Sequence, residues 1–241
     1  AGDDYFAAMY HNIDTLKESI AALSAPEDKR PIVGDLLQRG DLAILVTPID
    51  SAAPKGRLIL PQQQTIRDVL DSGAGAVVVK ETELSHMLSC LAQTPRIVIT
   101  DSQAFAPVAA IVPEDIPLTS FSILFARHKG DLIQAVRGAA ALETVQDGDT
   151  ILISEGCTHH RQCDDIGSVK LPRWIRGHTG KELRFVFSSG TEFPEDLSPY
   201  RLIVHCGGCM LNPRQMRYRQ KCAAEQGVPM TNYGVLIAHI Q

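Results

Sequence analysis

From residue 40 onward, short apolar runs rich in β-branched residues alternate with amphipathic stretches, and this alternation restricts the fold more than any other feature. Apolar runs lie at residues 42–46, 76–79 and 97–99, with helical patterns between them at residues 62–70 and 81–91. A run that is apolar on both faces is typical of a strand in a parallel sheet covered by helices. The sequence therefore predicts an α/β fold in which crossover helices join parallel strands.

The same alternation returns after a Pro-bounded stretch at residues 112–117, which indicates a second α/β domain. We place the boundary near residue 117, so that two small domains, each a parallel sheet with crossover helices, span residues 30–117 and 118–241. In the second domain we expect helices at residues 130–142 and 216–225, strands at residues 150–153, 183–188 and 201–204, and a final strand at residues 235–240.

The first 29 residues carry a different pattern. Apolar residues from Tyr5 to Leu23 recur at helical spacing, and Pro26 and a charged run follow them. The chain does not begin with methionine, so we interpret residues 1–29 as a helical linker that remains from a longer protein and follows a domain missing here.

Composition limits the classes of partner and compartment. Of the 241 residues, 44% are hydrophobic, which is enough to build real cores. The net charge of −5 argues against a nucleic-acid-binding surface, which is usually basic. No apolar run approaches the roughly 20 residues that cross a bilayer, and the acidic start is not a signal peptide. We therefore expect a cytoplasmic protein without nucleic-acid or membrane partners. Four basic residues collect near the C-terminal cysteines, at Arg214, Arg217, Arg219 and Lys221. They indicate either a solvated helix face or a docking surface.

Two short runs hold three cysteines and two histidines in a pattern suited to a soft metal. The first run carries Cys157 and His159, and the second carries His205, Cys206 and Cys209. Each run directly follows a predicted strand, so the side chains should emerge together where neighbouring parallel strands end. Thiolate ligands favour zinc, copper(I) or iron–sulfur clusters over magnesium or calcium. The spacing predicts a metal site at this edge of the second sheet.

Three chemistries fit this spacing. A structural zinc site takes four protein ligands in two short pairs, and Cys-x-His with Cys-x-x-Cys would supply them. An iron–sulfur cluster takes mostly thiolates, and three are present, with one corner left to a weaker ligand or to none. The pair Cys206 and Cys209 could instead act as a redox dithiol. Spacing alone does not decide among the three.

Longer motifs surround these residues and extend over nearly the whole chain. They are Glu155–His160, Asp164–Gly167, Lys170–Trp174 and His205–Asn212, with further segments at residues 48–50, 53–61, 100–105 and 231–234. Taken together, these motifs resemble the [FeFe]-hydrogenase maturation GTPase family, HydF. The resemblance implies a scaffold or carrier protein. Such a protein holds a precursor of the diiron subcluster, which two radical-SAM maturases assemble, and delivers it to apo-[FeFe]-hydrogenase.

The resemblance also implies a [4Fe-4S] cluster held by Cys157, Cys206 and Cys209. A cluster with three thiolate anchors keeps one iron open to exchange, which suits a carrier. Candidates for a fourth, exchangeable ligand are His159, His205 and Asp164. For each candidate a structural role competes with ligation: His159 as a surface histidine, His205 as a strand-ending side chain bonded to the backbone, and Asp164 as a helix cap.

The family carries an N-terminal GTPase domain that this chain does not contain. The nearest approach to a phosphate loop, residues 177–182, lacks the leading glycine at the right spacing and has Glu182 where Ser or Thr should bind magnesium. GTP is therefore expected only through the missing domain, and the chain itself is expected to be non-catalytic. The rival function is a zinc-stabilised redox or hydrolytic protein that uses the dithiol of the CGGC motif.

The first domain has no catalytic residue cluster of its own, so assembly is its expected task. In the resembled family this domain makes the dimer. An exposed sheet edge that continues across a two-fold axis is a physical route to such a dimer. We therefore expect a homodimer formed through residues 30–117.

Overall fold

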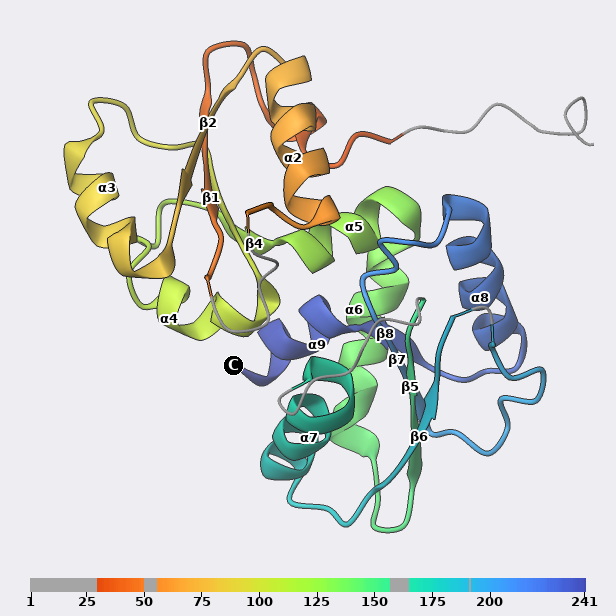
Figure 1. Ribbon diagram of the computed structural model, residues 1–241. Helices are drawn as coiled ribbons and strands as arrows, with labels where there is room; N and C mark the ends of the chain where they lie inside the picture. The colour runs from red at the N-terminus through yellow and green to blue at the C-terminus, as the bar shows by residue number, and fades with distance from the viewer. Residues whose placement is uncertain (1–29, 50–55, 157–164, 191) are drawn as a thin grey trace, which may run out of the picture. The chain divides into compact units, whose positions relative to one another are not determined.

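The computed structural model describes residues 30–49, 56–156, 165–190 and 192–241. In this part of the chain, two parallel four-stranded sheets are interspersed with helices, which confirms the predicted α/β class (Figure 1). None of the described helices combines the length and apolar character needed to span a bilayer.

The first sheet has the strand order β2-β1-β3-β4 with every pair parallel. Successive residues of β1 point to opposite faces, so Ala43 and Leu45 enter one apolar cluster and Ile44 and Val46 enter another. Helices α2 and α5 cover the first face, and α3 and α4 cover the second. The elements are β1 (Leu42–Val46), α2 (Leu60–Asp71), β2 (Gly75–Val79), α3 (Leu84–Cys90), β3 (Ile97–Thr100), α4 (Phe105–Ala109), β4 (Leu118–Ser120) and α5 (Phe121–Lys129), with 3₁₀ turns at Gly34–Leu36, Glu81–Glu83 and Ser102–Ala104.

The second sheet repeats this plan with the order β6-β5-β7-β8, again parallel throughout. Its two apolar clusters lie under α6, α7 and α9 on one face and under α8 on the other. The elements are α6 (Leu132–Ala140), β5 (Thr150–Ser154), α7 (Leu171–Thr179), β6 (Arg184–Ser188), β7 (Leu202–His205), α8 (Pro213–Glu225), β8 (Met230–Asn232) and α9 (Tyr233–Ile240), with a 3₁₀ turn at Ala141–Thr144 and a π-helical turn at Ile166–Lys170.

The segment that we expected to open the second domain belongs to the first sheet. Strand β4 pairs with β3, and Leu118 lies opposite Val98. Helix α4 ends at Ala109, and after the two prolines that precede β4 the chain returns to the sheet. The first sheet therefore extends past the boundary predicted near residue 117.

The final strand predicted at residues 235–240 is wrong, because this segment forms helix α9. The Asn232 side chain accepts a hydrogen bond from the backbone N–H of Val235 at 2.8 Å and caps the helix. Residues 233–237 are all buried, so α9 lacks the polar face that would have marked a helical period. A short run that is apolar on every side does not distinguish a buried helix from a buried strand.

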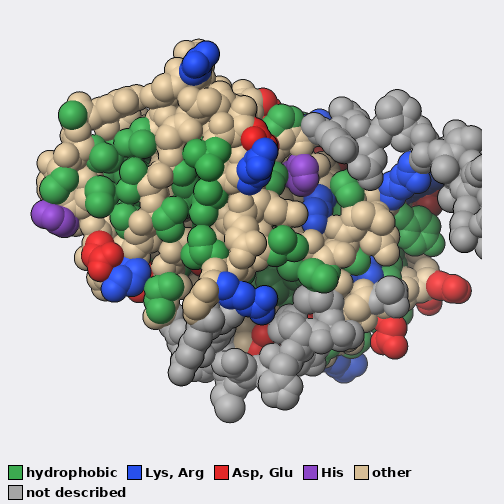
Figure 2. Space-filling model, turned by 45° about the horizontal axis from the view of Figure 1, so that its top comes forward, with side chains coloured by type: hydrophobic (Ala, Val, Ile, Leu, Met, Phe, Trp, Pro, Cys, Tyr) green, Lys and Arg blue, Asp and Glu red, His purple; other side chains and the backbone are tan. Residues whose placement is uncertain are grey.

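Each sheet ends in an edge strand with exposed apolar side chains. Within the described residues, β2 pairs only with β1, and β6 pairs only with β5. Val78 of β2 is 42% exposed, and Leu70 of the neighbouring helix α2 is 55% exposed. Figure 2 shows hydrophobic side chains gathered over the left of the view, where the first domain lies. On β6, Val186 and Phe187 are about equally exposed, at 40% and 39%.

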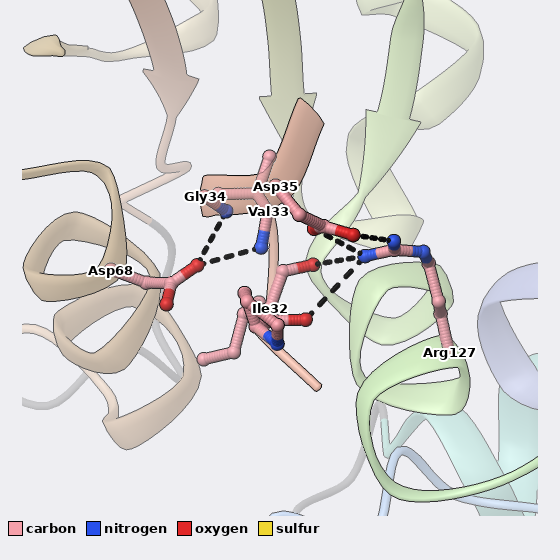
Figure 3. A network of polar contacts seen from close by, with 7 residues as sticks. Ile32, Val33, Gly34, Asp35, Asp68 and Arg127 are labelled. Atoms are coloured by element: carbon pink, nitrogen blue, oxygen red, sulfur yellow. Dashed lines mark hydrogen bonds and ion pairs between the residues drawn. The ribbon is translucent and has the colours of Figure 1, made fainter. Parts of the chain in front are cut away.

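A polar network fixes residues 32–35 on helices α2 and α5 (Figure 3). The Asp68 carboxylate accepts hydrogen bonds from the backbone N–H groups of Val33 and Gly34, at 2.7 and 2.6 Å. Arg127 donates to the Ile32 carbonyl at 3.3 Å and forms a two-pronged ion pair with Asp35. The hydrogen bond to Asp35 raises the pKa of Arg127. The last turn of α5 thus holds the segment through which the chain enters the first domain.

Candidate metal centre

The predicted site lies at the carboxyl edge of the second sheet, where β5 and β7 end side by side. In the register of these two strands Ser154 lies opposite His205, so Gly156 and Cys206 follow at the same edge. Cys206 and Cys209 are both half-buried. Three of the residues predicted for the site, Cys157, His159 and Asp164, lie outside the described residues.

The Cys206 sulfur joins the ends of the two strands. It accepts hydrogen bonds from the backbone N–H of Gly156 at 3.1 Å and from that of Gly208 at 3.3 Å. Backbone N–H donors aimed at a sulfur stabilise negative charge on it, which favours a metal-binding thiolate. Gly156 is the last described residue before Cys157, so the end of β5 that leads to the first cysteine run contacts the second run.

Two glycines permit the close approach of these loops. Gly208 has a φ of +62°, a backbone conformation that favours glycine, and a Cβ there would lie 2.4 Å from the Met216 Cε. A Cβ on Gly156 would lie 2.7 Å from the Leu211 Cγ. Gly208 is therefore favoured mainly by its positive φ, because the flexible end of Met216 could move aside, whereas Gly156 is favoured by the close approach of Leu211.

A buried lysine from helix α5 holds the loop that carries Cys209. The Lys129 side chain donates to the carbonyl oxygens of Gly208, Cys209 and Leu211, at 2.8, 3.0 and 2.9 Å. An ammonium group has three N–H donors, so these contacts match its full capacity. Burial lowers the pKa of Lys129, while the nearby Cys209 and Cys206 oppose that shift. The lysine sets the shape of the loop and places a positive charge beside its thiols.

His205 is buried and has partners at both ring nitrogens. Its Nδ1–H donates to the Cys206 carbonyl at 2.7 Å, and its Nε2 accepts from the Arg219 guanidinium at 2.8 Å. Burial lowers the pKa of His205 to about 4, so the ring is neutral at neutral pH. To become a metal ligand His205 would have to lose the Arg219 contact. The geometry favours the alternative role, a strand-ending histidine bonded to the backbone.

Arg219 departs from the solvated helix face expected for the basic residues of α8. It is only 4% exposed, donates to the Gly190 carbonyl at 2.7 Å and lies 5.1 Å from the centroid of the Phe193 ring. Arg214, Arg217 and Lys221 are exposed, as expected of that face. Arg219 therefore orients His205 instead of facing solvent.

Three of the motifs that carry the family resemblance meet beside this loop. The buried Glu155 carboxylate accepts a hydrogen bond from the Tyr233 hydroxyl at 3.2 Å. A Cβ on Gly167 would lie within 2.6 Å of both groups, at 2.4 Å from the hydroxyl oxygen and 2.5 Å from the Glu155 Oε1. Burial raises the pKa of Tyr233 well above its usual value, so the hydroxyl keeps its proton. Residues far apart in the sequence thus support the end of β5 from which Cys157 follows.

Lys129 and Arg219 had not been predicted as site residues. Lys129 lies 79 residues before Gly208 in the sequence and belongs to helix α5. Arg219 was noted only as one of several basic residues. Neither residue forms a sequence motif with the cysteines, since each reaches the site only through a tertiary contact.

The fold and the site define an α/β protein with two parallel sheets and a loop carrying Cys206 and Cys209 at the carboxyl edge of the second sheet. Two family models match nearly all of the chain: the hydrogen maturase F dimerization domain at residues 32–130 and the hydrogen maturase F tetramerization domain at residues 133–241. The chain therefore belongs to the hydrogen maturase F family, HydF, which supports a role in hydrogenase maturation. A comparison with curated proteins gave no match.

Proposed function

We propose that this chain binds a [4Fe-4S] cluster and that it holds and delivers the diiron subcluster precursor to apo-[FeFe]-hydrogenase. The observation that carries the proposal is the environment of Cys206 and Cys209. Their half-buried thiols lie where two backbone N–H groups and the Lys129 ammonium offset negative charge. Hydrogen bonds to sulfur and nearby charge are the means by which proteins stabilise and tune iron–sulfur clusters. The donor set present at this edge therefore fits such a cluster.

The proposed ligands are Cys157, Cys206 and Cys209. Gly156 donates to the Cys206 sulfur at 3.1 Å, so the residue preceding Cys157 already lies beside a second ligand. His159 and Asp164 remain the candidates for the exchangeable fourth position. His205 would serve there only after releasing Arg219, and we assign it instead to orienting the Cys206 carbonyl. When bound, the cluster would supply an iron site open to exchange.

We also propose that the first domain forms a homodimer through the edge of strand β2. The family model over residues 32–130 is named for dimerisation. Among the described residues β2 pairs only on its β1 side, and the exposed Val78 and Leu70 lie on or beside its other edge. A second copy could extend the sheet across a two-fold axis and cover this apolar surface. The corresponding edge at β6, with Val186 and Phe187, is proposed for the tetramer contact.

Anaerobic reconstitution with iron and sulfide tests the cluster proposal. The parent chain should turn brown, show broad charge-transfer absorption and give an EPR signal when reduced. Cys206→Ala should abolish the cluster, whereas Cys90→Ala is a matched control because Cys90 is exposed on α3 in the first domain. Unchanged iron content in Cys206→Ala would refute the ligand assignment. Stoichiometric zinc without iron uptake would favour the rival zinc-stabilised redox or hydrolytic protein.

Delivery needs a separate test with partners. The chain would be loaded in the presence of the two radical-SAM maturases, repurified and mixed with apo-[FeFe]-hydrogenase. Hydrogen evolution that depends on the loaded chain supports the carrier role. Equal hydrogenase activation by the Cys206→Ala variant would show that the cysteine site is not used in delivery.

A further inference from the structure

Three potential metal ligands meet on the surface of the second domain, apart from the cysteine loop. Glu143 lies in the 3₁₀ turn after α6, His178 in the last turn of α7, and His239 in the last turn of α9. Their ligand atoms all lie within 4.8 Å of one another. No sequence motif joins them, because each comes from a different element.

The two imidazoles converge on a single carboxylate oxygen. The Nε2 atoms of His178 and His239 lie 2.8 and 2.9 Å from the same Oε1 of Glu143. The ring centroids are 6.0 Å apart and the ring planes are tilted by 57°. Hydrogen bonds from the two histidines lower the pKa of Glu143, so the carboxylate is ionised. The side chains of His178 and His239 are 25% and 32% exposed, which leaves the group accessible to an ion from solvent.

The backbone beneath these side chains is held by one core. Leu142, Ile175 and Leu236 are fully buried in the same apolar cluster, and each lies within three residues of one of the three ligands. The elements are therefore fixed in place, whereas the ligand side chains at the surface can rotate. Small side-chain rotations would let an ion replace the hydrogen bonds between them.

We propose that Glu143, His178 and His239 form a divalent zinc site with a fourth position open to water. Two imidazoles and one carboxylate are a donor set that zinc takes in sites with an open position. Imidazole ligands disfavour magnesium and calcium, which prefer oxygen donors. The ion would bind neutral histidines through Nε2, so each ring would carry its proton on Nδ1. Each ring would release its Nε2 hydrogen bond to Glu143 for a bond to zinc.

Such a site would connect the C-terminal helix to two other elements of the second domain. Helix α9 begins at Tyr233, whose hydroxyl bonds Glu155 beside the cysteine loop, and His239 lies in its last turn. Zinc would therefore clamp the far end of the helix that supports the cysteine loop. The inference does not depend on the proposed cluster, because it uses none of its ligands.

The experiment must separate this site from the thiols, which also bind zinc. An untagged chain carrying Cys157→Ser, Cys206→Ser and Cys209→Ser would be titrated with zinc chloride by calorimetry, with bound metal measured after dialysis. We expect one zinc per chain, and cobalt substitution should give weak ligand-field bands without thiolate charge transfer. Zinc should also raise the Tm, since it binds the folded state.

Ligand variants made in the same triple-serine chain, which retains Cys90, Cys163 and Cys222, decide the assignment. His178→Gln and His239→Gln should each lower zinc affinity at least about tenfold, the scale at which even supporting groups of a metal site affect binding. His128→Gln is the matched control, because this histidine packs against Phe125 on α5 and is not one of the three ligands. Absence of stoichiometric zinc, or affinity unchanged in His178→Gln, would overturn the proposal. Should one glutamine variant be poorly folded, Glu143→Gln provides the same test at the third ligand.

Discussion

Lys129 provides the sharpest test of how the fold supports the cysteine loop. Lys129→Met keeps the length and most of the volume of the side chain but removes its charge and its donors. The three carbonyl groups of Gly208, Cys209 and Leu211 then lose their hydrogen bonds inside a buried region. The variant should therefore lose stability and weaken metal binding together.

The magnitude follows from two opposing terms. A hydrogen bond to a charged group contributes a net ~1.5–3 kcal/mol, and an unsatisfied buried acceptor costs ~1–3 kcal/mol. Removing the ammonium relieves a desolvation cost of several kcal/mol, which offsets part of the loss. We expect the free energy of unfolding to fall by about 2–4 kcal/mol, because three acceptors lose one shared donor group.

Urea denaturation followed by circular dichroism measures this loss, and iron content after reconstitution measures the effect on the site. Lys221→Met is the matched control, because the Lys221 side chain is 73% exposed and pairs only at the surface with Glu225. Its effect should stay within about 0.5 kcal/mol. A Lys129→Met variant as stable as the parent, with the same iron content, would refute the role assigned to this lysine.

Three further predictions concern acid stability, the loop glycine and assembly. Folding lowers the pKa of His205 from about 6.5 to about 4, so between these pH values the unfolded chain binds a proton at His205 and the folded chain does not. The free energy of unfolding should therefore fall by about 2–3 kcal/mol as the pH falls from about 6.5 to 4. Urea titrations of the cluster-free chain should show this slope, reduced in His205→Gln. Gly208→Ala should destabilise the chain by about 1–2 kcal/mol, measured as a lower urea midpoint, because its positive φ disfavours a residue with a Cβ. Val78→Lys should convert the assembly to smaller species in size-exclusion chromatography with light scattering.

Each of these has an outcome that contradicts it. An acid slope equal in the parent and His205→Gln would mean that other groups control acid stability. A Gly208→Ala chain with parental stability and iron uptake would show that the loop can relax. For assembly the control is Val186→Lys on β6, which should keep the dimer and remove only the tetramer. A monomeric parent, or an unchanged dimer in Val78→Lys, would exclude the β2 edge.

Much of the fold was predictable because β-branched apolar runs alternate with amphipathic helical stretches along the chain. The segments that form β1, β3, β5 and β7 are apolar on both faces, and that pattern can be recognised in the sequence without knowledge of tertiary contacts. Helix α9 was not predictable in this way, because a fully buried helix has no polar face. Strand β4 was missed as part of the first sheet because a partner strand, not its own sequence, decides where it pairs.

Local sequence patterns were sufficient to reveal the α/β class, the cysteine motifs and the strand that precedes Cys206 and Cys209. Those features are local, so neighbouring residues are sufficient to reveal them. Three contacts could be found only in the folded chain: Lys129 holds the cysteine loop, Arg219 donates to the His205 Nε2, and Glu143 meets two histidines. These contacts join residues from separate elements, and packing of the two sheets against their helices is what brings their polar atoms within bonding distance.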